Sequence, residues 1–118
     1  MNERRAAERR GRGAERLAAA LLRAKGYRIL ARRFRSPAGE IDLVAARGRV
    51  LAFVEVKRRR DAAEAAESVT AKGRARIARA AENFVALYPD RHTCAFRFDV
   101  MTLSGLFPVH VADAWRPD

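Results

Sequence analysis

Apolar residues recur at helical spacing in two stretches of the chain. The first covers about residues 13–25, where three leucines fall at helical spacing and Gly26 follows as a C-terminal stop. The second covers residues 71–87, with Thr70 placed to cap the helix and Pro89 placed to end it. We therefore predict two helices, one near the start of the chain and one past its middle.

Shorter runs rich in Val, Ile, Phe and Leu lie between and after these helices. Such runs are typical of β-strands. The expected strands cover residues 27–34, 40–46, 49–57, 93–103 and 107–113. The order α-β-β-β-α-β-β predicts an α/β (α+β) fold, in which helices flank one mixed central sheet.

The domain organisation follows from length and local composition. A chain of 118 residues corresponds to a single domain. Residues 1–12 are strongly charged and carry no sustained apolar stripe, so we expect a basic, flexible N-terminal arm ahead of a domain spanning residues 13–118. No apolar stretch approaches the length of a membrane span, and Cys94, as the single cysteine, excludes an intrachain disulfide. These features favour a cytoplasmic protein with no membrane contact.

Charged residues interrupt the two apolar strands expected on either side of Arg47-Gly48. They are Glu40, Asp42, Glu55 and Lys57. If Arg47 and Gly48 form a two-residue turn, Ala46 pairs with Arg49, and alternation places all four charged residues on one face. In that register Asp42 lies opposite Phe53, and the other face carries Ile41, Leu43 and Ala45.

Both faces of this hairpin are substantially apolar, which favours a sheet covered on both sides. The alternative is a hairpin with one polar, solvated face. Half-buried carboxylates that lie close together raise each other's pKa unless a cation compensates. Asp42 and Glu55 are near enough on the hairpin to converge on one small ion, and their oxygen ligands favour Mg²⁺ or Mn²⁺. Lys57 is placed to orient or deprotonate a water, or to stabilise charge on a phosphate.

The first helix brings a further acid toward the sheet. Glu15 begins a stripe at i, i+3, i+4 and i+7 spacing that continues through Ala18, Ala19 and Leu22. The stripe should face the sheet, which would place Glu15 near the hairpin. The alternative is an ordinary acid in the first helical turn, where it favours the helix dipole.

The net charge of +11 comes almost entirely from arginine, whose planar fork suits phosphate groups. Cationic side chains precede the turn at Ser36-Pro37, follow Lys57 directly and line the second helix. The candidate nucleic-acid contacts are Arg33, Arg35, Arg58, Arg59, Arg60, Lys72 and Arg76. The alternatives are solvated strand ends, an exposed helix face and the arginine-rich composition of a GC-rich genome.

Several motifs occur in a fixed order over roughly residues 11–114. They are "GRGAE", "RRFR", "GEIDLVA", "FVEVKRR", "ESVTAKGRARI" and "RFDV". In this order they resemble the YraN family of small bacterial proteins. "GEIDLVA" and "FVEVK" also resemble the D-x(n)-[D/E]-x-K motif of restriction-endonuclease-like nucleases. The family is similar in fold to archaeal Holliday-junction resolvases, which implies a restriction-endonuclease-like αβββαβ core.

The resemblance also implies roles for single residues. It makes Asp42 and Glu55 metal ligands, Lys57 the catalytic lysine and Glu15 the helical acid that completes the site, with Glu40 in a supporting role. Arg97 and Asp99 of "RFDV" fit a scaffold ion pair. Two departures stand out: Arg33 occupies a position where the family often has Asn, and the loop after the third strand lacks a glycine usually found there.

The implied function is a Mg²⁺- or Mn²⁺-dependent nuclease that hydrolyses DNA phosphodiester bonds. By analogy with the resolvases, its substrate would be branched or structured DNA and its assembly a homodimer. Two alternatives stay open at this point. One is a noncatalytic nucleic-acid-binding module on the same fold, and the other is a scaffold for a partner protein.

Overall fold

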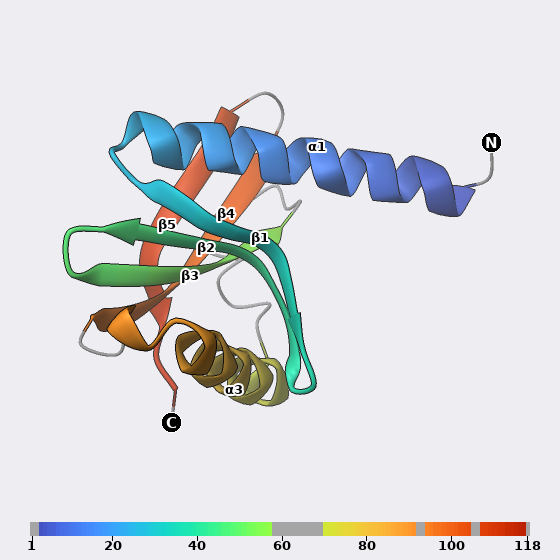
Figure 1. The fold of residues 1–118 in the computed structure, drawn as a ribbon. Helices are drawn as coiled ribbons and strands as arrows, with labels where there is room; N and C mark the ends of the chain where they lie inside the picture. The colour runs from blue at the N-terminus through green and yellow to red at the C-terminus, as the bar shows by residue number, and fades with distance from the viewer. Residues whose placement is uncertain (1–2, 58–69, 92–93, 105–106, 118) are drawn as a thin grey trace.

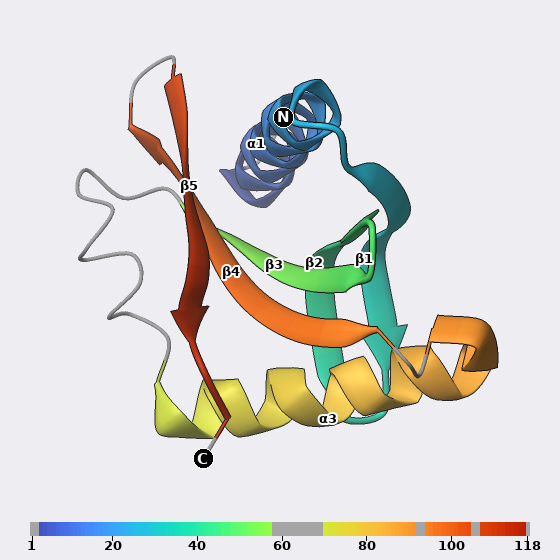
Figure 2. The same ribbon diagram turned by 90° about the vertical axis from the view of Figure 1, so that its left-hand side faces the viewer.

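Two helices cover opposite faces of a five-stranded sheet (Figures 1 and 2). The structure is a computed structural model, and it describes residues 3–57, 70–91, 94–104 and 107–117. The helices are α1 (Glu3–Ala24) and α3 (Ala71–Leu87), with a short 3₁₀ turn η1 (Pro89–Arg91). The strands are β1 (Arg28–Ser36), β2 (Gly39–Arg47), β3 (Val50–Lys57), β4 (Ala95–Ser104) and β5 (Phe107–Trp115).

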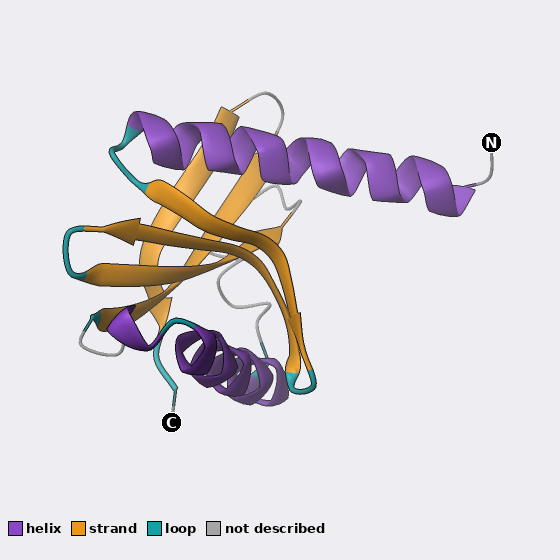
Figure 3. Cartoon of the chain, in the orientation of Figure 1, coloured by secondary structure: helices purple, strands orange, loops and turns teal. Residues whose placement is uncertain are grey.

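The sheet has the order β1-β2-β3-β4-β5 and is mixed (Figure 3). Neighbouring strands run antiparallel except β3 and β4, which are parallel and are connected through α3. A parallel pair requires such a crossover, because a tight turn can join only antiparallel strands. The predicted fold class is confirmed: the elements are those of a restriction-endonuclease-like αβββαβ core, followed by β5.

Each face of the sheet packs against one helix. The α1 face is closed by a cluster that includes Ala18, Ala19, Leu22, Leu43, Ala45, Ala52, Val54 and Met101. The α3 face is closed by a cluster that includes Ile41, Val44, Leu51, Phe53, Ala80, Ala81, Phe84 and Trp115. Both faces are therefore covered, as the apolar pattern of the hairpin predicted. Within the described part of the chain, neither helix is both long and apolar enough to span a bilayer.

The helix limits agree with the sequence at three of four ends. Thr70 caps α3, and its side chain accepts a hydrogen bond of 3.0 Å from the Gly73 amide. Gly26, which follows α1, has a φ of 92°, a value that glycine adopts freely at a helix C-terminus. The expected start of the first helix near residue 13 was wrong, because α1 begins at Glu3. Ala, Arg and Glu dominate that segment, and their high helix propensity extends the helix without an apolar stripe.

The predicted turn between β2 and β3 was displaced by one residue. Arg47 pairs with Val50, so the two turn residues are Gly48 and Arg49 rather than Arg47 and Gly48. Gly48 has a φ of 58° and takes the first central position, where such two-residue turns need a positive φ. The pairing consequently shifts by two residues, and Ala46 lies opposite Leu51 instead of Arg49. A shift of two does not by itself move a side chain to the other face, but it changes its partner across the hairpin.

The predicted face of Ile41 was also wrong. Ile41 packs in the α3 cluster, whereas Leu43, two residues later, packs in the α1 cluster. Simple alternation would have placed both on the same face. Between the pairs that these residues make with β1, Arg33 has a left-handed φ of 52°. Figure 1 shows β1 and β2 bending together toward α3 in this region, which carries Ile41 onto the α3 side.

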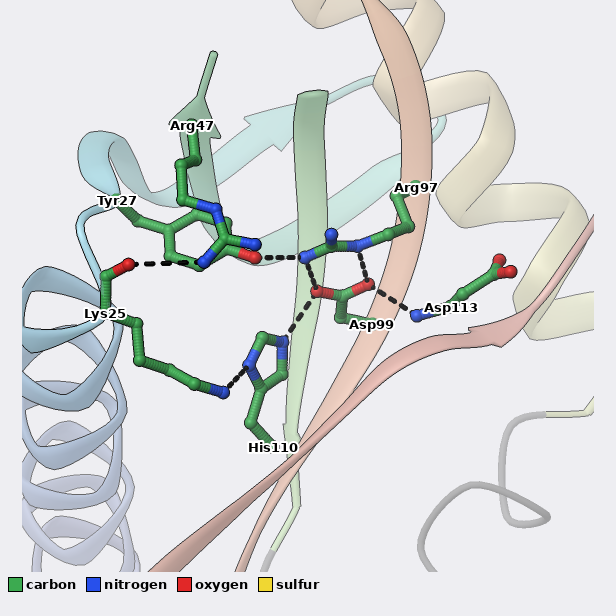
Figure 4. Close-up of polar contacts among 7 residues, drawn as sticks. All are labelled: Lys25, Tyr27, Arg47, Arg97, Asp99, His110 and Asp113. Atoms are coloured by element: carbon green, nitrogen blue, oxygen red, sulfur yellow. Dashed lines mark hydrogen bonds and ion pairs between the residues drawn. The ribbon is translucent and has the colours of Figure 1, made fainter. Parts of the chain in front are cut away.

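A buried carboxylate, Asp99, ties the end of α1 to β4 and β5 (Figure 4). Arg97 donates two hydrogen bonds of 2.8 Å to Asp99 and a third to the hydroxyl of Tyr27. His110 Nε2 lies 2.7 Å from Asp99 Oδ2, and His110 Nδ1 lies 2.7 Å from Lys25 Nζ. Because an ammonium group can only donate, Nδ1 accepts from Lys25 and Nε2 donates to Asp99. The Arg–Asp scaffold pair expected from "RFDV" is thus present in a larger network.

The network keeps Asp99 ionised despite its burial. Burial by itself raises the pKa of Asp99, but hydrogen bonds from His110, Arg97 and the Asp113 amide outweigh it and lower the pKa below its usual value. From β2, Arg47 donates a hydrogen bond to the backbone carbonyl of Lys25 and lies over the ring of Tyr27. Contacts with β2, β4 and β5 therefore fix the segment that follows α1.

We predict that Asp99→Ala destabilises the protein by roughly 3–5 kcal/mol, because it leaves the Arg97 guanidinium without its buried partner. Equilibrium unfolding in urea measures the change. Asp113→Asn is the matched control, since Asp113 is exposed and its left-handed φ of 53° suits asparagine. The control should change stability by less than about 0.5 kcal/mol. Equal losses in the two variants would contradict a structural role for Asp99.

Candidate active site

Two carboxylates meet where the pairing between β2 and β3 ends. The last paired residues are Leu43 and Val54, and in the same register Asp42 and Glu55 come next. The prediction that Asp42 faces Phe53 is thereby corrected, because Phe53 pairs with Val44. Continued by one residue, the observed register places Asp42 opposite Glu55, so their backbones are closer together than in the predicted register.

At this point the Asp42 side chain accepts a hydrogen bond in place of a backbone carbonyl. Its Oδ2 accepts a bond of 2.8 Å from the amide of Val56 in β3. An amide in a strand needs an acceptor, and normally the neighbouring strand supplies it from its backbone. Asp42 is therefore oriented by β3 although it belongs to β2.

Both carboxyl groups have raised pKa values. Burial raises the pKa of Asp42, against the lowering effect of the Val56 hydrogen bond, and the charge of Glu40 raises it further. Burial and the Asp42 carboxylate raise the pKa of Glu55 to about 7. Ionising both carboxyl groups in this partly buried position is therefore unfavourable unless a cation binds there.

Lys57 lies beside these carboxylates. Its Nζ is 3.5 Å from Glu55 Oε1, and both side chains are largely buried, with exposed fractions of 29% and 21%. The charge of Lys57 lowers the pKa of Asp42 and of Glu55, though not enough to restore ordinary values. The structure therefore brings Asp42, Glu55 and Lys57 into one cluster.

Glu15 approaches the cluster from α1. The stripe it begins is buried against the sheet at Ala18, Ala19 and Leu22, and the Glu15 side chain itself is 14% exposed. Burial raises the pKa of Glu15, and the charge of Asp42 raises it further. Glu15 is thus close enough to Asp42 to share its electrostatic environment. Because α1 begins at Glu3, Glu15 does not lie in the first helical turn, as the alternative assumed.

Glu40 and two arginines form the outer side of the cluster. Arg33 Nε lies 3.7 Å from Glu15 Oε1 and 3.8 Å from Glu40 Oε1. Arg35 Nε lies 3.5 Å from Glu40 Oε2, and its side chain is 77% exposed. The sequence predicted phosphate contacts for both arginines and missed their contacts with the acids. Setting the turn after Ser36 correctly would have revealed one of them, because Arg35 and Glu40 pair directly across β1 and β2.

The other predicted nucleic-acid contacts are placed differently. Arg58, Arg59 and Arg60 lie outside the described residues. Lys72 and Arg76 are exposed on α3. Arg76 lies against Gly39, which precedes Glu40 in β2. The exposed side of α3 therefore adjoins the β1–β2 turn, next to the outer side of the acid cluster.

Comparison with known proteins places the chain in a family. Residues 14–103 match the model described as "Uncharacterised protein family UPF0102". This chain belongs to the UPF0102 family. The predicted membership in the YraN-like family is confirmed by this match and by the relatives described next.

Curated UPF0102 relatives match along nearly their whole length. A UPF0102 protein of Nitrobacter winogradskyi is 55% identical over 106 residues, which cover 89% of this chain and 90% of the relative. One of Parvibaculum lavamentivorans is 50% identical over 113 residues, covering 95% and 85%. The UPF0102 protein amb4503 of Paramagnetospirillum magneticum is 51% identical over 118 residues, covering 96% and 92%. The similarity therefore extends over most of this chain and of each relative.

The donor set of this UPF0102 protein fits an open site for a hard divalent ion. Among the described residues, no three His, Cys, Asp or Glu side chains are grouped closely enough to enclose a metal. Mg²⁺, however, usually retains several waters and binds proteins through one or two carboxylates together with substrate phosphates. Asp42 and Glu55 supply two such carboxylates, and burial raises the pKa of both, an effect that a bound cation would offset. A closed structural zinc site does not fit this donor set.

We predict that Glu55→Gln stabilises the metal-free protein at pH 8 by roughly 2 kcal/mol and has little effect at pH 4. The folded protein binds a proton at Glu55 between the ordinary pKa of 4.5 and about 7, where the unfolded chain does not. The favourable contribution of the protonated group is therefore present below pH 4.5 and is lost as the pH rises through 7. Glutamine retains the neutral form at every pH.

Urea unfolding at both pH values tests this prediction, in buffer containing a chelator. Glu82→Gln serves as the control, because Glu82 is an exposed acid on α3. A stabilisation that is the same at pH 4 and pH 8, or a destabilisation at pH 8, would contradict the raised pKa of Glu55.

Proposed function

We propose that this UPF0102 protein is a divalent-metal-dependent nuclease that hydrolyses DNA phosphodiester bonds. The observation that carries the proposal is the convergence of Asp42, Glu55 and Lys57 where β2 parts from β3. Two half-buried carboxylates with a lysine beside them form an unfavourable arrangement in an ordinary core. The same arrangement is favourable where a cation and a phosphate bind together.

Each residue has a distinct part in the proposed chemistry. Asp42 and Glu55 hold Mg²⁺ or Mn²⁺, and the Val56 amide keeps the Asp42 carboxylate oriented. Such an ion polarises a phosphate and lowers the pKa of bound water. Lys57 stabilises the charge that develops on the scissile phosphate, and Glu15 completes the acidic lining from the helix side. Glu40 acts at a distance, through its charge and its contacts with arginine.

The arginine-rich composition supports nucleic acid as the substrate class. With a net charge of +11, the chain attracts a polyanion despite its acidic cluster. Lys72 and Arg76 are exposed on α3 near the β1–β2 turn, and Arg35 is exposed on the hairpin itself. These side chains contact the DNA backbone in our proposal. A preference for branched DNA and a homodimeric assembly rest on the resemblance to resolvases, as parts of the same proposal.

We predict that the purified protein cleaves labelled DNA in Mg²⁺ or Mn²⁺ and not in chelator. Asp42→Asn and Glu55→Gln should each lower the cleavage rate by at least about 100-fold, since several kcal/mol of charge stabilisation depend on the bound ion. Linear, flap and four-way-junction DNA, tested in parallel, identify the preferred substrate. Glu82→Gln, which removes an acid outside the site, should cleave at the wild-type rate.

Three other outcomes separate the competing functions. Metal-dependent cleavage that survives in both Asp42→Asn and Glu55→Gln would contradict the assigned site. Salt-sensitive binding of every DNA, without cleavage under either metal, would instead favour a noncatalytic nucleic-acid-binding module. The absence of both binding and cleavage would leave the scaffold function as the better account.

A further inference from the structure

Arg33 has an unfavourable backbone conformation at the edge of the acid cluster. Its φ of 52° lies in the left-handed region, where a long side chain gains no local compensation. Residues persist in such a conformation when the surrounding structure holds them there, and they gather at functional sites. The contacts of the Arg33 side chain therefore indicate which interactions hold the residue in this conformation.

The Arg33 side chain bridges two acids from different elements. Its Nε lies 3.7 Å from Glu15 Oε1 in α1 and 3.8 Å from Glu40 Oε1 in β2. Both distances exceed those of a hydrogen bond, so the attraction is electrostatic and imposes no single geometry. The Arg33 side chain is 40% exposed, so the guanidinium can move away from the acids toward solvent.

The positive charge of Arg33 also reaches the centre of the cluster. Its charge lowers the pKa of Asp42 as well as that of Glu15. Lys57, the other cation that acts on Asp42, is paired with Glu55 on the far side of the cluster. Arg33 in β1 and Lys57 in β3 thus supply positive charge from the two strands that flank β2, which carries Asp42.

We propose that Arg33 is an internal counter-ion that competes with the divalent cation for the acid cluster and so sets its metal affinity. This inference rests on the proposed function. Without metal, the positive charge of Arg33 partly neutralises Glu15 and Glu40. When a cation binds, it neutralises these acids in place of Arg33, and the Arg33 guanidinium can then bind a phosphate of the DNA. Metal binding and DNA binding then support each other through one side chain, and such a coupling is reciprocal.

Arg35 provides a matched control for this role. It lies on the same strand and also contacts Glu40, at 3.5 Å, so both arginines carry the same charge into the same neighbourhood. Unlike Arg33, whose charge lowers the pKa of both Glu15 and Asp42, Arg35 is 77% exposed and contacts the outer acid, Glu40. Removing Arg35 should therefore leave the metal affinity nearly unchanged.

The experiment is calorimetric titration of Mn²⁺ into the metal-free full-length protein at pH 8, without DNA. We predict that Arg33→Asn binds Mn²⁺ roughly threefold to tenfold more tightly than wild type, because one competing charge is removed. Arg35→Asn should match wild type within about twofold. Asparagine adopts a left-handed φ readily, and Arg33→Gly is a second variant with no steric restriction at this position.

The outcomes distinguish this inference from the proposed function. If wild type binds Mn²⁺ and the Arg33 variants bind it equally or more weakly, the counter-ion role is overturned and the metal site stands. Equal gains in Arg33→Asn and Arg35→Asn would also overturn it, since the effect would then reflect net charge alone. If neither wild type nor the Arg33 variants bind Mn²⁺, both the inference and the proposed metal site fail.

Discussion

The parting of β2 from β3 after the Leu43–Val54 pair is the constraint on which the site depends. Up to that pair β2 and β3 form a regular hairpin that is buried on both faces, one packed against α1 and the other against α3. Beyond it, β2 bends with β1 toward α3, and Asp42 is left beside β3 without a backbone partner there. The carboxylate of Asp42 instead accepts a hydrogen bond from the Val56 amide, which brings a carboxyl group into a half-buried position.

The remainder of the fold makes this position tolerable. Lys57 and Arg33 supply positive charge from β3 and β1, yet the pKa of Glu55 still rises to about 7. The Asp99 network holds the segment after α1 against β4 and β5, so the helix that carries Glu15 is anchored at its C-terminal end (Figure 4). In the Asp99 network a buried carboxylate is matched by hydrogen-bond donors, which is typical of a structural role. In the acid cluster two partly buried carboxyl groups have raised pKa values, which supports the ligand-binding role that we propose.

The sequence predicted the elements well because their signals are local. Thr70 and Gly26 mark helix ends through their own backbone preferences, and the stripe from Ala18 to Leu22 identifies the buried side of α1. The position of the turn at Gly48 was harder to predict, because glycine suits more than one turn position and a displacement of one residue shifts the whole register by two. A shift of two by itself leaves the alternation of faces unchanged, but it changes the residue that lies opposite Asp42.

The bend at Arg33 could not be predicted from local propensity. Arginine rarely adopts a left-handed φ, so the tertiary packing of Ile41 under α3 outweighs the preference of the residue itself. The motif comparison marked Arg33 as a departure from the family pattern, which often has Asn, but only the structure relates that departure to backbone conformation. Its contacts with Glu15 and Glu40 likewise depend on the approach of three separate elements.

The central claim is that the acid cluster binds a divalent cation, and thermal unfolding of the metal-free protein at pH 8 tests it most directly. Increasing Mn²⁺ should raise the melting temperature of wild type progressively, because a ligand that binds the folded state stabilises it by mass action. Asp42→Asn should show little or no increase over the same range. An unchanged melting temperature in wild type, or an equal rise in both proteins, would contradict the account.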